Sequence, residues 1–385
     1  MGSAACYHLA KPGTKVLGIE QFDIPHSKGS YGDTRIIRLA YFEHPSYVPL
    51  LRRSYENWTE LEKESCEQLL VKTGGIDAGP IDGELFLGSK RSCIEHNIDY
   101  EVLNSEELSK RFPGFELPSN FHAIYQKDAG FLFAERCVVK YSEMAQKHGA
   151  VIKTHERMVE YNNLDNGHIQ VITNKCTYQC KKLVLTVGAW SNKFIKFDLN
   201  GKEFEVGKPE RQVIGWFEPK IPGLFHVDNK FPIFLIDTKV EHRDEEERIS
   251  LYGFPVVNSE HIHYNGFKIG VYGHFNEEID PDVRHNTMPA KRDEDLLRKY
   301  TSMYFPLATG KTNMMKECMF TNSYDEHFVI DFLPCNENII IAGGFSGHGF
   351  KFCSVIGEIL SNMVHDGTPG YDTSLFRISR FDKHK

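Results

Sequence analysis

The spacing of apolar residues along the chain predicts helices and strands that alternate, with no long stretch of either kind. Apolar runs of strand length occur at residues 16–20 (VLGIE), 182–187 (KLVLTV) and 338–342 (NIIIA). From residue 350 onward, apolar side chains recur three and four positions apart until Gly367, which predicts an amphipathic helix closed by a glycine. Together these patterns favour the α/β class, tending toward α+β.

The first twenty residues have the order of a dinucleotide-binding unit. A helix of small residues is predicted over 2–11, and the strand at 16–20 ends in the acid Glu20. In a G-x-G-x-x-G fold the third glycine lets helix and strand pack closely, and an acid about 20 positions on binds ribose hydroxyls. Gly2 and Glu20 fit these two positions, so we expect the first strand and the G-x-G to be missing from this sequence. The alternative is that Glu20 only ends a strand and Gly2 only follows the initiator methionine.

The middle of the chain gives weaker signals. Arg35 and Arg38 lie three residues apart and would share one face of a helix. The further predictions are a Gly/Ser-rich loop running into a helix or strand at 27–41, a helix at 47–64, a loop-rich break at 74–83, a strand at 151–159 and a solvated hairpin tip at 241–248.

A second candidate site follows the strand at 338–342. Four glycines fall within residues 343–349 (GGFSGHG), where the backbone could approach a ligand closely. The start of the next helix presents free N–H groups and a partial positive charge. Lys351 stands in that first turn, where the helix dipole disfavours a cation. It is therefore either a functional cation or a solvated surface lysine.

Composition narrows the class of protein. The 385 residues include 45 Lys+Arg and 53 Asp+Glu, and the formal net charge of −8 argues against nucleic acid as a partner. No apolar stretch reaches the ~18–20 residues of a membrane span. Nine scattered cysteines, without a C-x-x-C pair or a signal peptide, favour a reducing intracellular setting. His261, His263 and His274 lack a carboxylate or cysteine at ligand spacing, so we expect no metal site.

Five short segments form a specific combination in a fixed order. They are GDTRIIR at 32–38, YGFP at 252–255, ECMFT at 317–321, DEHF at 325–328 and GFSGHGFKF at 344–352. In this combination the sequence resembles the monomeric sarcosine oxidase and peroxisomal sarcosine–pipecolate oxidase family of flavoproteins, over nearly the whole chain.

The resemblance implies FAD in a Rossmann-like domain made of residues 1–75, 134–208 and 318–385. A substrate domain with a mixed sheet would comprise residues 76–133 and 209–317. The implied reaction is the oxidation of a small secondary amino acid, such as sarcosine or L-pipecolate, by O₂. It would give hydrogen peroxide and an imine or demethylated amino acid. A monomer is implied, and a peroxisomal location by analogy. The C-terminal residues 382–385 (DKHK) lack a peroxisomal address, which makes the cytosol the alternative.

The resemblance also implies roles for individual residues. Cys318 would form a thioether with the flavin, Arg38 and Lys351 would bind the substrate carboxylate, and Lys268 would assist the reaction with oxygen. Two fixed cations orient a carboxylate better than one, and they would favour the neutral amine by repulsion. Tyr252 and His348 would line the substrate cavity. The remaining expected cofactor-binding residues are Gly2, Glu20, Arg35, Met158, Gly344, Gly347 and Gly349, together with Lys351.

Two departures from the family pattern lie near these residues. Tyr31 stands where relatives commonly carry a histidine, which leaves the efficiency of covalent attachment open. Residues 268–274 (KIGVYGH) differ from the family's Lys-x-x-Tyr-His, so Tyr272 or a displaced His274 takes the place of a cavity histidine. Two other functions remain open: an FAD-linked dehydrogenase that uses another acceptor, and a catalytically dead relative that acts as a binding scaffold.

Overall fold

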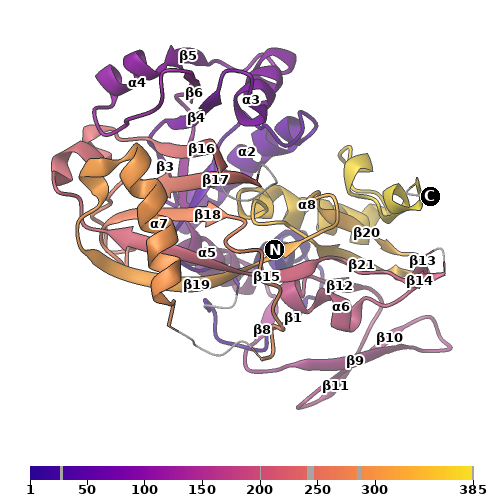
Figure 1. Cartoon of the computed structure of the whole chain (residues 1–385). Helices are drawn as coiled ribbons and strands as arrows, with labels where there is room; N and C mark the ends of the chain where they lie inside the picture. Colours follow the sequence, from indigo (N-terminus) through magenta and orange to yellow (C-terminus); the bar gives the residue numbers. More distant parts are fainter. Residues whose placement is uncertain (27–28, 200, 241–246, 284–287, 384–385) are drawn as a thin grey trace.

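The computed structural model describes residues 1–26, 29–199, 201–240, 247–283 and 288–383. A large mixed sheet with α7 against it forms one side of the molecule, and a group of helices with smaller sheets forms the other (Figure 1). This arrangement confirms the α/β class with an α+β tendency. The helices are α1 Gly2–Ala10, α2 Tyr47–Ser65, α3 Glu84–Glu95, α4 Ser105–Arg111, α5 Ala134–Lys147, α6 Ser191–Phe194, α7 Lys291–Tyr304 and α8 Cys353–Asp366.

The large sheet has eight strands in the order β19-β15-β18-β17-β16-β4-β6-β5. Neighbouring strands are antiparallel except β16 and β4, which are parallel. One face packs against α7 through an aromatic core that includes Phe115, Phe234 and Phe305. The strands are β4 Gly75–Pro80, β5 Glu101–Asn104, β6 Phe121–Gln126, β15 Lys208–Phe217, β16 Ile233–Val240, β17 Glu247–Phe254, β18 Phe267–Tyr272 and β19 Thr312–Asn322.

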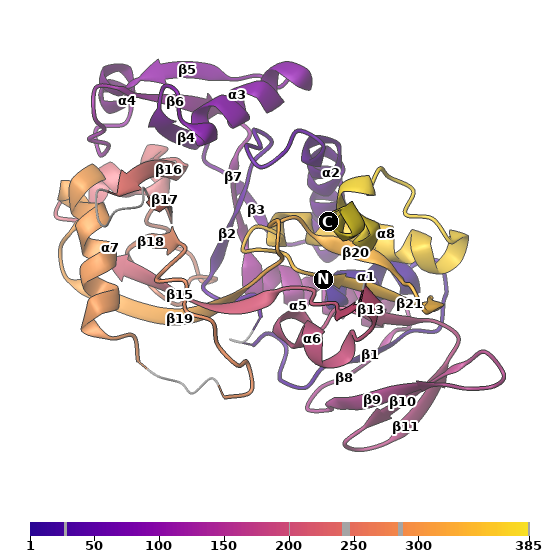
Figure 2. The same cartoon turned by 45° about the vertical axis from the view of Figure 1, so that its right-hand side comes forward.

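Smaller sheets support the helices and join the two sides. β1 and β8 form a parallel pair, while β12 is parallel to β21, which also pairs with antiparallel β20. β2, β7 and β3 form an antiparallel sheet between the large sheet and the helices (Figure 2). The strands are β1 Leu17–Ile19, β2 Thr34–Ile37, β3 Leu70–Lys72, β7 Gly130–Phe133, β8 Val151–Lys153, β9 Met158–Asn163, β10 Ile169–Thr173, β11 Thr177–Cys180, β12 Leu183–Leu185, β13 Asp198–Leu199, β14 Lys202–Glu203, β20 Val329–Leu333 and β21 Asn336–Gly343.

The loop-rich break predicted at 74–83 is wrong, because most of it is the buried strand β4. The glycines of β4 allow close packing and do not form a turn. A Cβ on Gly75 would lie 2.6 Å from the Cβ of Ala129. β4 hydrogen-bonds to β16 on one side and β6 on the other, so its backbone groups are satisfied inside the sheet.

The other predicted elements differ from the structure mainly in the residues at which they begin and end. The strand expected at 151–159 is two strands, β8 and β9, separated by a turn in which His155 has φ of 53°. Arg35 lies in strand β2, which excludes the helical alternative there. The predicted tip at 241–248 lies largely outside the described residues. The division into two domains stays a prediction; its boundary at residue 318 falls inside β19.

The helices pack closely where α1 meets α8. Gly357 of α8 faces α1, and a Cβ there would lie 2.7 Å from the carbonyl carbon of Ala4 and 2.8 Å from its Cβ. α1 also packs against α5, so it cannot simply move away. This contact holds the start of α1 in place beside the strand ends described below.

We expect Gly357→Ala to destabilise the fold by about 1–3 kcal/mol, because overpacking a rigid contact outweighs the gain in helix propensity. Urea unfolding followed by circular dichroism measures the change. Gly223→Ala is the matched control, since Gly223 is exposed and a Cβ there would come no closer than 3.7 Å to another atom. Equal midpoints for the two variants would contradict the close-packing account.

Candidate active site

Two residues predicted to bind the nucleotide part of FAD lie at the ends of β1 and β12, each of which has a parallel partner strand. Glu20 directly follows β1, and its Oε1 accepts the backbone N–H of Phe22 at 3.0 Å. Gly2 opens α1, and a Cβ on it would lie 2.9 Å from Oγ1 of Thr186, the residue after β12. No acidic residue stands in the first turn of α1. The helix start is thus suited to a phosphate, and the nearby carboxylate to a hydroxyl.

Met158 and the glycine loop are the other parts of the predicted cofactor site. Met158 opens β9 and packs in the same apolar cluster as Ile19 of β1. Gly344 and Gly347 have φ of 59° and 73°, a conformation that favours glycine. A Cβ on Gly347 would lie 2.6 Å from the ring of Phe320.

The glycine loop packs on β19 near Cys318. The backbone N–H of Ser346 donates to the carbonyl of Thr321 at 3.0 Å. A Cβ on Gly349 would lie 2.6 Å from the Phe345 side chain, so the loop also folds tightly on itself. The loop therefore contacts the strand that carries Cys318 and leads along the chain into the turn Phe350–Phe352, which contains Lys351.

Cys318 lies on the face of the large sheet that points toward the helices. It is buried and packs in a cluster with Ile214 and Trp216, against which Tyr252 and Tyr264 also pack. Lys316 shares this face of β19, and its Nζ is 5.4 Å from the centre of the Tyr264 ring. The thiol is thus enclosed by aromatic side chains, and Lys316 lies over one of them, Tyr264.

Lys268 ties the large sheet to β2. Its Nζ donates to the carbonyls of Gly32 and Thr34 at 2.6 and 2.8 Å and contacts Thr34 Oγ1 at 3.0 Å. Burial lowers the pKa of Lys268 well below its usual value, and the Arg35 charge lowers it further. Arg35 donates to the carbonyls of Tyr31 and Thr34. Tyr252 lies over Gly270 on the neighbouring strand, where no side chain displaces its ring.

Arg38 and Lys351 come together although they are far apart in the sequence. The Arg38 guanidinium carbon is 4.8 Å from the centre of the Tyr41 ring, and Lys351 Nζ is 5.3 Å from the same centre. Both side chains are buried, at 3% and 6% exposure, so Lys351 is not a solvated surface lysine. Its Nζ donates to the carbonyl of His348 at 2.9 Å, and its own carbonyl accepts Trp58 Nε1–H at 3.1 Å.

Two carboxylates accompany this pair of cations, so the site is not the purely cationic pocket that the resemblance implies. Glu43 Oε2 lies 3.3 Å from Arg38 Nη2, and Asp77 Oδ2 lies 3.5 Å from Arg38 Nη1. The repulsion expected to favour a neutral amine is therefore largely compensated. Asp77 belongs to β4 and Glu43 to the segment between β2 and α2.

The protonation states follow from burial and these charges. Burial lowers the pKa of Lys351 to about 7, and the Arg38 charge adds to the effect while Glu43 and Asp77 oppose it. Burial lowers the pKa of His348 to about 4. His348 Nε2 contacts the carbonyl of Glu326 at 3.0 Å and must donate to it, so Nδ1 accepts the Tyr41 hydroxyl at 2.5 Å. His348 is thus a neutral, oriented side chain.

Comparison with known proteins identifies the family. The model of the family "FAD dependent oxidoreductase" (DAO) matches residues 1–363. Monomeric sarcosine oxidase of Bacillus sp. (strain B-0618) is 38% identical over 384 residues, which cover 99% of this chain and 93% of that protein. Peroxisomal sarcosine oxidase of Homo sapiens is 32% identical over 385 residues, with 99% and 93% covered. The structure of NikD, an unusual amino acid oxidase essential for nikkomycin biosynthesis, superposes with a TM-score of 0.79 at 20% identity, covering 97% and 94% of the two chains.

The chain belongs to the FAD dependent oxidoreductase family. As an FAD-dependent oxidoreductase it needs a cradle for the dinucleotide, and the residues present fit one. The acid after β1, the start of α1 beside the end of β12 and the left-handed glycines of the 343–349 loop all lie at strand ends, where open α/β sheets bind nucleotides.

Two residues of this oxidoreductase site, Glu43 and Asp77, were missed in the sequence. Glu43 follows Arg38 by only five positions. Outside a helix, however, a separation of five positions does not predict that two side chains are in contact. Asp77 gave a clearer signal, because it is the one acid in a glycine-rich apolar segment (GGIDAG). A strand prediction for that segment would have placed a buried acid in the sheet, and buried acids need a partner.

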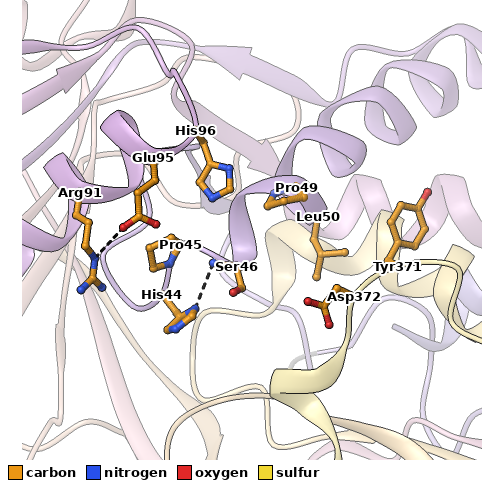
Figure 3. A pocket seen from close by; sticks show the side chains of 10 residues that line it. All are labelled: His44, Pro45, Ser46, Pro49, Leu50, Arg91, Glu95, His96, Tyr371 and Asp372. Carbon is orange, nitrogen blue, oxygen red and sulfur yellow. Dashed lines mark hydrogen bonds and ion pairs between the residues drawn. The ribbon is translucent and has the colours of Figure 1, made fainter.

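A surface pocket of about 450 Å³ lies between the start of α2, the end of α3 and residues 371–372 (Figure 3). Its side chains carry both charge signs, and Arg91 is paired with Glu95 inside it. None of the predicted site residues lines this pocket. It lies on the outer side of the segment that carries Glu43, since His44 lines it.

Two of the three histidines at which no metal site is expected lie against buried acids. His263 Nδ1 is 2.7 Å from Asp33 Oδ1, and His274 Nε2 is 2.8 Å from Asp293 Oδ1. Within the described ranges, no group of three or more His, Cys, Asp or Glu side chains could hold a metal ion. The helices in the same ranges include none long and apolar enough to cross a membrane.

Proposed function

We propose that this protein oxidises the C–N bond of a small secondary amino acid, with sarcosine or L-pipecolate as the first candidates, and passes the electrons to O₂. For sarcosine, O₂ and water would be consumed and glycine, formaldehyde and hydrogen peroxide formed. The observation that carries the proposal is the meeting of Arg38 and Lys351 beside Tyr41, on one side of a glycine loop that also packs on the Cys318 strand. The similarity to sarcosine oxidases supports the substrate class.

Arg38 and Lys351 hold the substrate carboxylate in this proposal. A guanidinium offers a planar fork and an ammonium offers a point charge, so together they fix both position and orientation. Bound FAD supplies the acceptor for the hydride that leaves carbon. Orientation matters because the reacting atoms must approach to about 3–3.5 Å. Tyr252 and neutral His348 would bound the space around the amine.

Cys318 is proposed to tether the flavin by a thioether. The new C–S bond would replace the thiol S–H and one C–H of a flavin methyl group, and O₂ would take up the two electrons and two protons released, giving hydrogen peroxide. Its buried position in an aromatic cluster suits a flat ring system, and Lys316 lies on the same face of β19. Tyr31, at the departure from the family pattern, hydrogen-bonds through its hydroxyl to that of Tyr264 in this cluster. The pair thus offers an oxygen donor and acceptor where relatives commonly carry a histidine.

Lys268 is proposed to assist the reaction with oxygen. Its Nζ has three oxygen contacts, matching the three N–H bonds of an ammonium, which favours the charged form against the effect of burial. A fixed cation stabilises negative charge that develops on oxygen. A cation at this position would favour an oxidase over a dehydrogenase with another acceptor, and an inert scaffold would not need one. A monomer is the proposed state, and the peroxisome and the cytosol remain the two predicted locations.

We expect purified protein with FAD to release one hydrogen peroxide per sarcosine, pipecolate or related amine consumed.

Binding of methoxyacetate, an analogue whose ether oxygen replaces the amine, tests the carboxylate site without a titrating amine. Its affinity should be constant below pH 7 and fall above it by up to tenfold per pH unit, because Lys351 loses its charge there while Arg38 keeps its own. Titration of the flavin spectrum measures it.

Lys351→Met should weaken methoxyacetate binding by about 10–100-fold at pH 6 and remove the pH dependence. Lys299→Met is the control, because Lys299 is exposed on α7. An unchanged affinity and pH profile in Lys351→Met would contradict the proposed carboxylate site. Absence of peroxide from every secondary amino acid tried, with another acceptor reduced instead, would favour the dehydrogenase.

We expect the flavin to remain with the protein after acid precipitation, and Cys318→Ser to release it as free FAD. Mass spectrometry of the peptide that contains residue 318 measures the added flavin mass. Cys353→Ser is the control, since Cys353 is also buried but lies in α8. A colourless precipitate from the unmodified protein would exclude the tether.

A further inference from the structure

Asp77 lies on the face of the large sheet that carries the proposed site. Asp77 pairs with Leu235 in β16, and Leu235 pairs with Tyr252 in β17. Directly paired residues point to the same face, and strands are about 4.8 Å apart, so Asp77 stands two strands from Tyr252 in one row. Its neighbours Ile76 and Ala78 point the other way, into the aromatic core.

The Asp77 carboxylate is deeply buried and only partly satisfied. The residue is 3% exposed. Ser89 Oγ donates to Oδ2 at 2.6 Å, and the same oxygen lies 3.5 Å from Arg38 Nη1. Oδ1 makes no hydrogen bond to any residue that the structure describes. A buried carboxylate of this kind is costly unless a charge compensates it, so its presence calls for a role beside Arg38.

Below pH 7, where Lys351 is charged, the ionisable groups around Arg38 can balance: Arg38 and Lys351 supply two cations, and Glu43 and Asp77 supply two carboxyl groups. Burial raises the pKa of Asp77, and the charges of Arg38 and Lys351 oppose that effect and favour its carboxylate form. An amino acid with one carboxylate and a protonated amine is itself neutral and adds no net charge to this set. A second carboxylate would add a negative charge to this set, with no cation left to pair with it.

We propose that Asp77 is a specificity-determining residue, which together with Glu43 restricts the site to secondary amino acids with a single carboxylate. This rests on the proposed function, because it takes Arg38 and Lys351 as the carboxylate site. The two acids differ in their settings. Asp77 is fixed in a central strand, whereas Glu43 lies in a connecting segment with 16% of its side chain exposed.

Sarcosine and iminodiacetate test the proposal, because they differ only by the second carboxylate. In the unmodified protein kcat/KM for sarcosine should exceed that for iminodiacetate by about 50-fold or more, from repulsion inside a buried site. Asp77→Asn keeps the shape of the side chain and removes its charge. It should therefore lower the ratio of kcat/KM for sarcosine to kcat/KM for iminodiacetate about tenfold. Glu43→Gln should narrow it in the same direction, which gives a second measurement if Asp77→Asn folds poorly.

Asp293→Asn is the control for loss of a buried ion pair. Asp293 pairs with Arg211 at 2.8 Å on the other face of the large sheet, so the variant should lose stability but keep the substrate ratio. Calorimetric titration of FAD-loaded protein with methoxyacetate and oxydiacetate gives the same comparison without turnover. Unchanged ratios in both Asp77→Asn and Glu43→Gln would overturn the assignment. If the unmodified protein takes neither sarcosine nor methoxyacetate, the proposed function fails, and this assignment fails with it.

Discussion

The burial of Arg38 is the constraint on which the site depends. A guanidinium at 3% exposure keeps its charge under all ordinary conditions, so the fold must supply anions to it. It does so from two directions, with Glu43 from its own segment and Asp77 from the large sheet. In the proposed function, the carboxylate of a substrate is a third anion that binds beside these groups. Lys351 lies close enough to bind that carboxylate together with Arg38. Because its pKa is lowered to about 7, its charge changes with pH near neutrality.

The elements that build this arrangement depend on close backbone contacts. Gly347 lets the glycine loop lie against Phe320 of β19, and the loop then leads directly to Lys351. β2 starts at Thr34, where Lys268 is anchored, and ends next to Arg38. A short strand and a short loop thus connect the region of Cys318 and Lys268 with the proposed carboxylate site. Because both connections are packed against the large sheet, the distance between the two regions is fixed by the fold.

Much of this could be predicted from the sequence, since local patterns carried it. The helix at 2–11, the strand at 338–342 and the helix that ends at Gly367 follow from periodicity and glycine placement. The pairing of Arg38 with Lys351 came only through resemblance, because no local pattern relates residues so far apart. Asp77 was missed for a physical reason: glycines that serve close packing in β4 have the same local signal as glycines that serve a turn. Glu43 was missed because its contact depends on how the segment after β2 turns back over Arg38.

A crystal structure of the FAD-bound protein with methoxyacetate tests the central claim most directly. The account predicts the carboxylate within ~3 Å of both the Arg38 guanidinium and Lys351 Nζ, with the ether oxygen turned toward a flavin ring that lies beside Cys318. A carboxylate bound elsewhere, with the Arg38 and Lys351 side chains making no contact to it, would contradict the account.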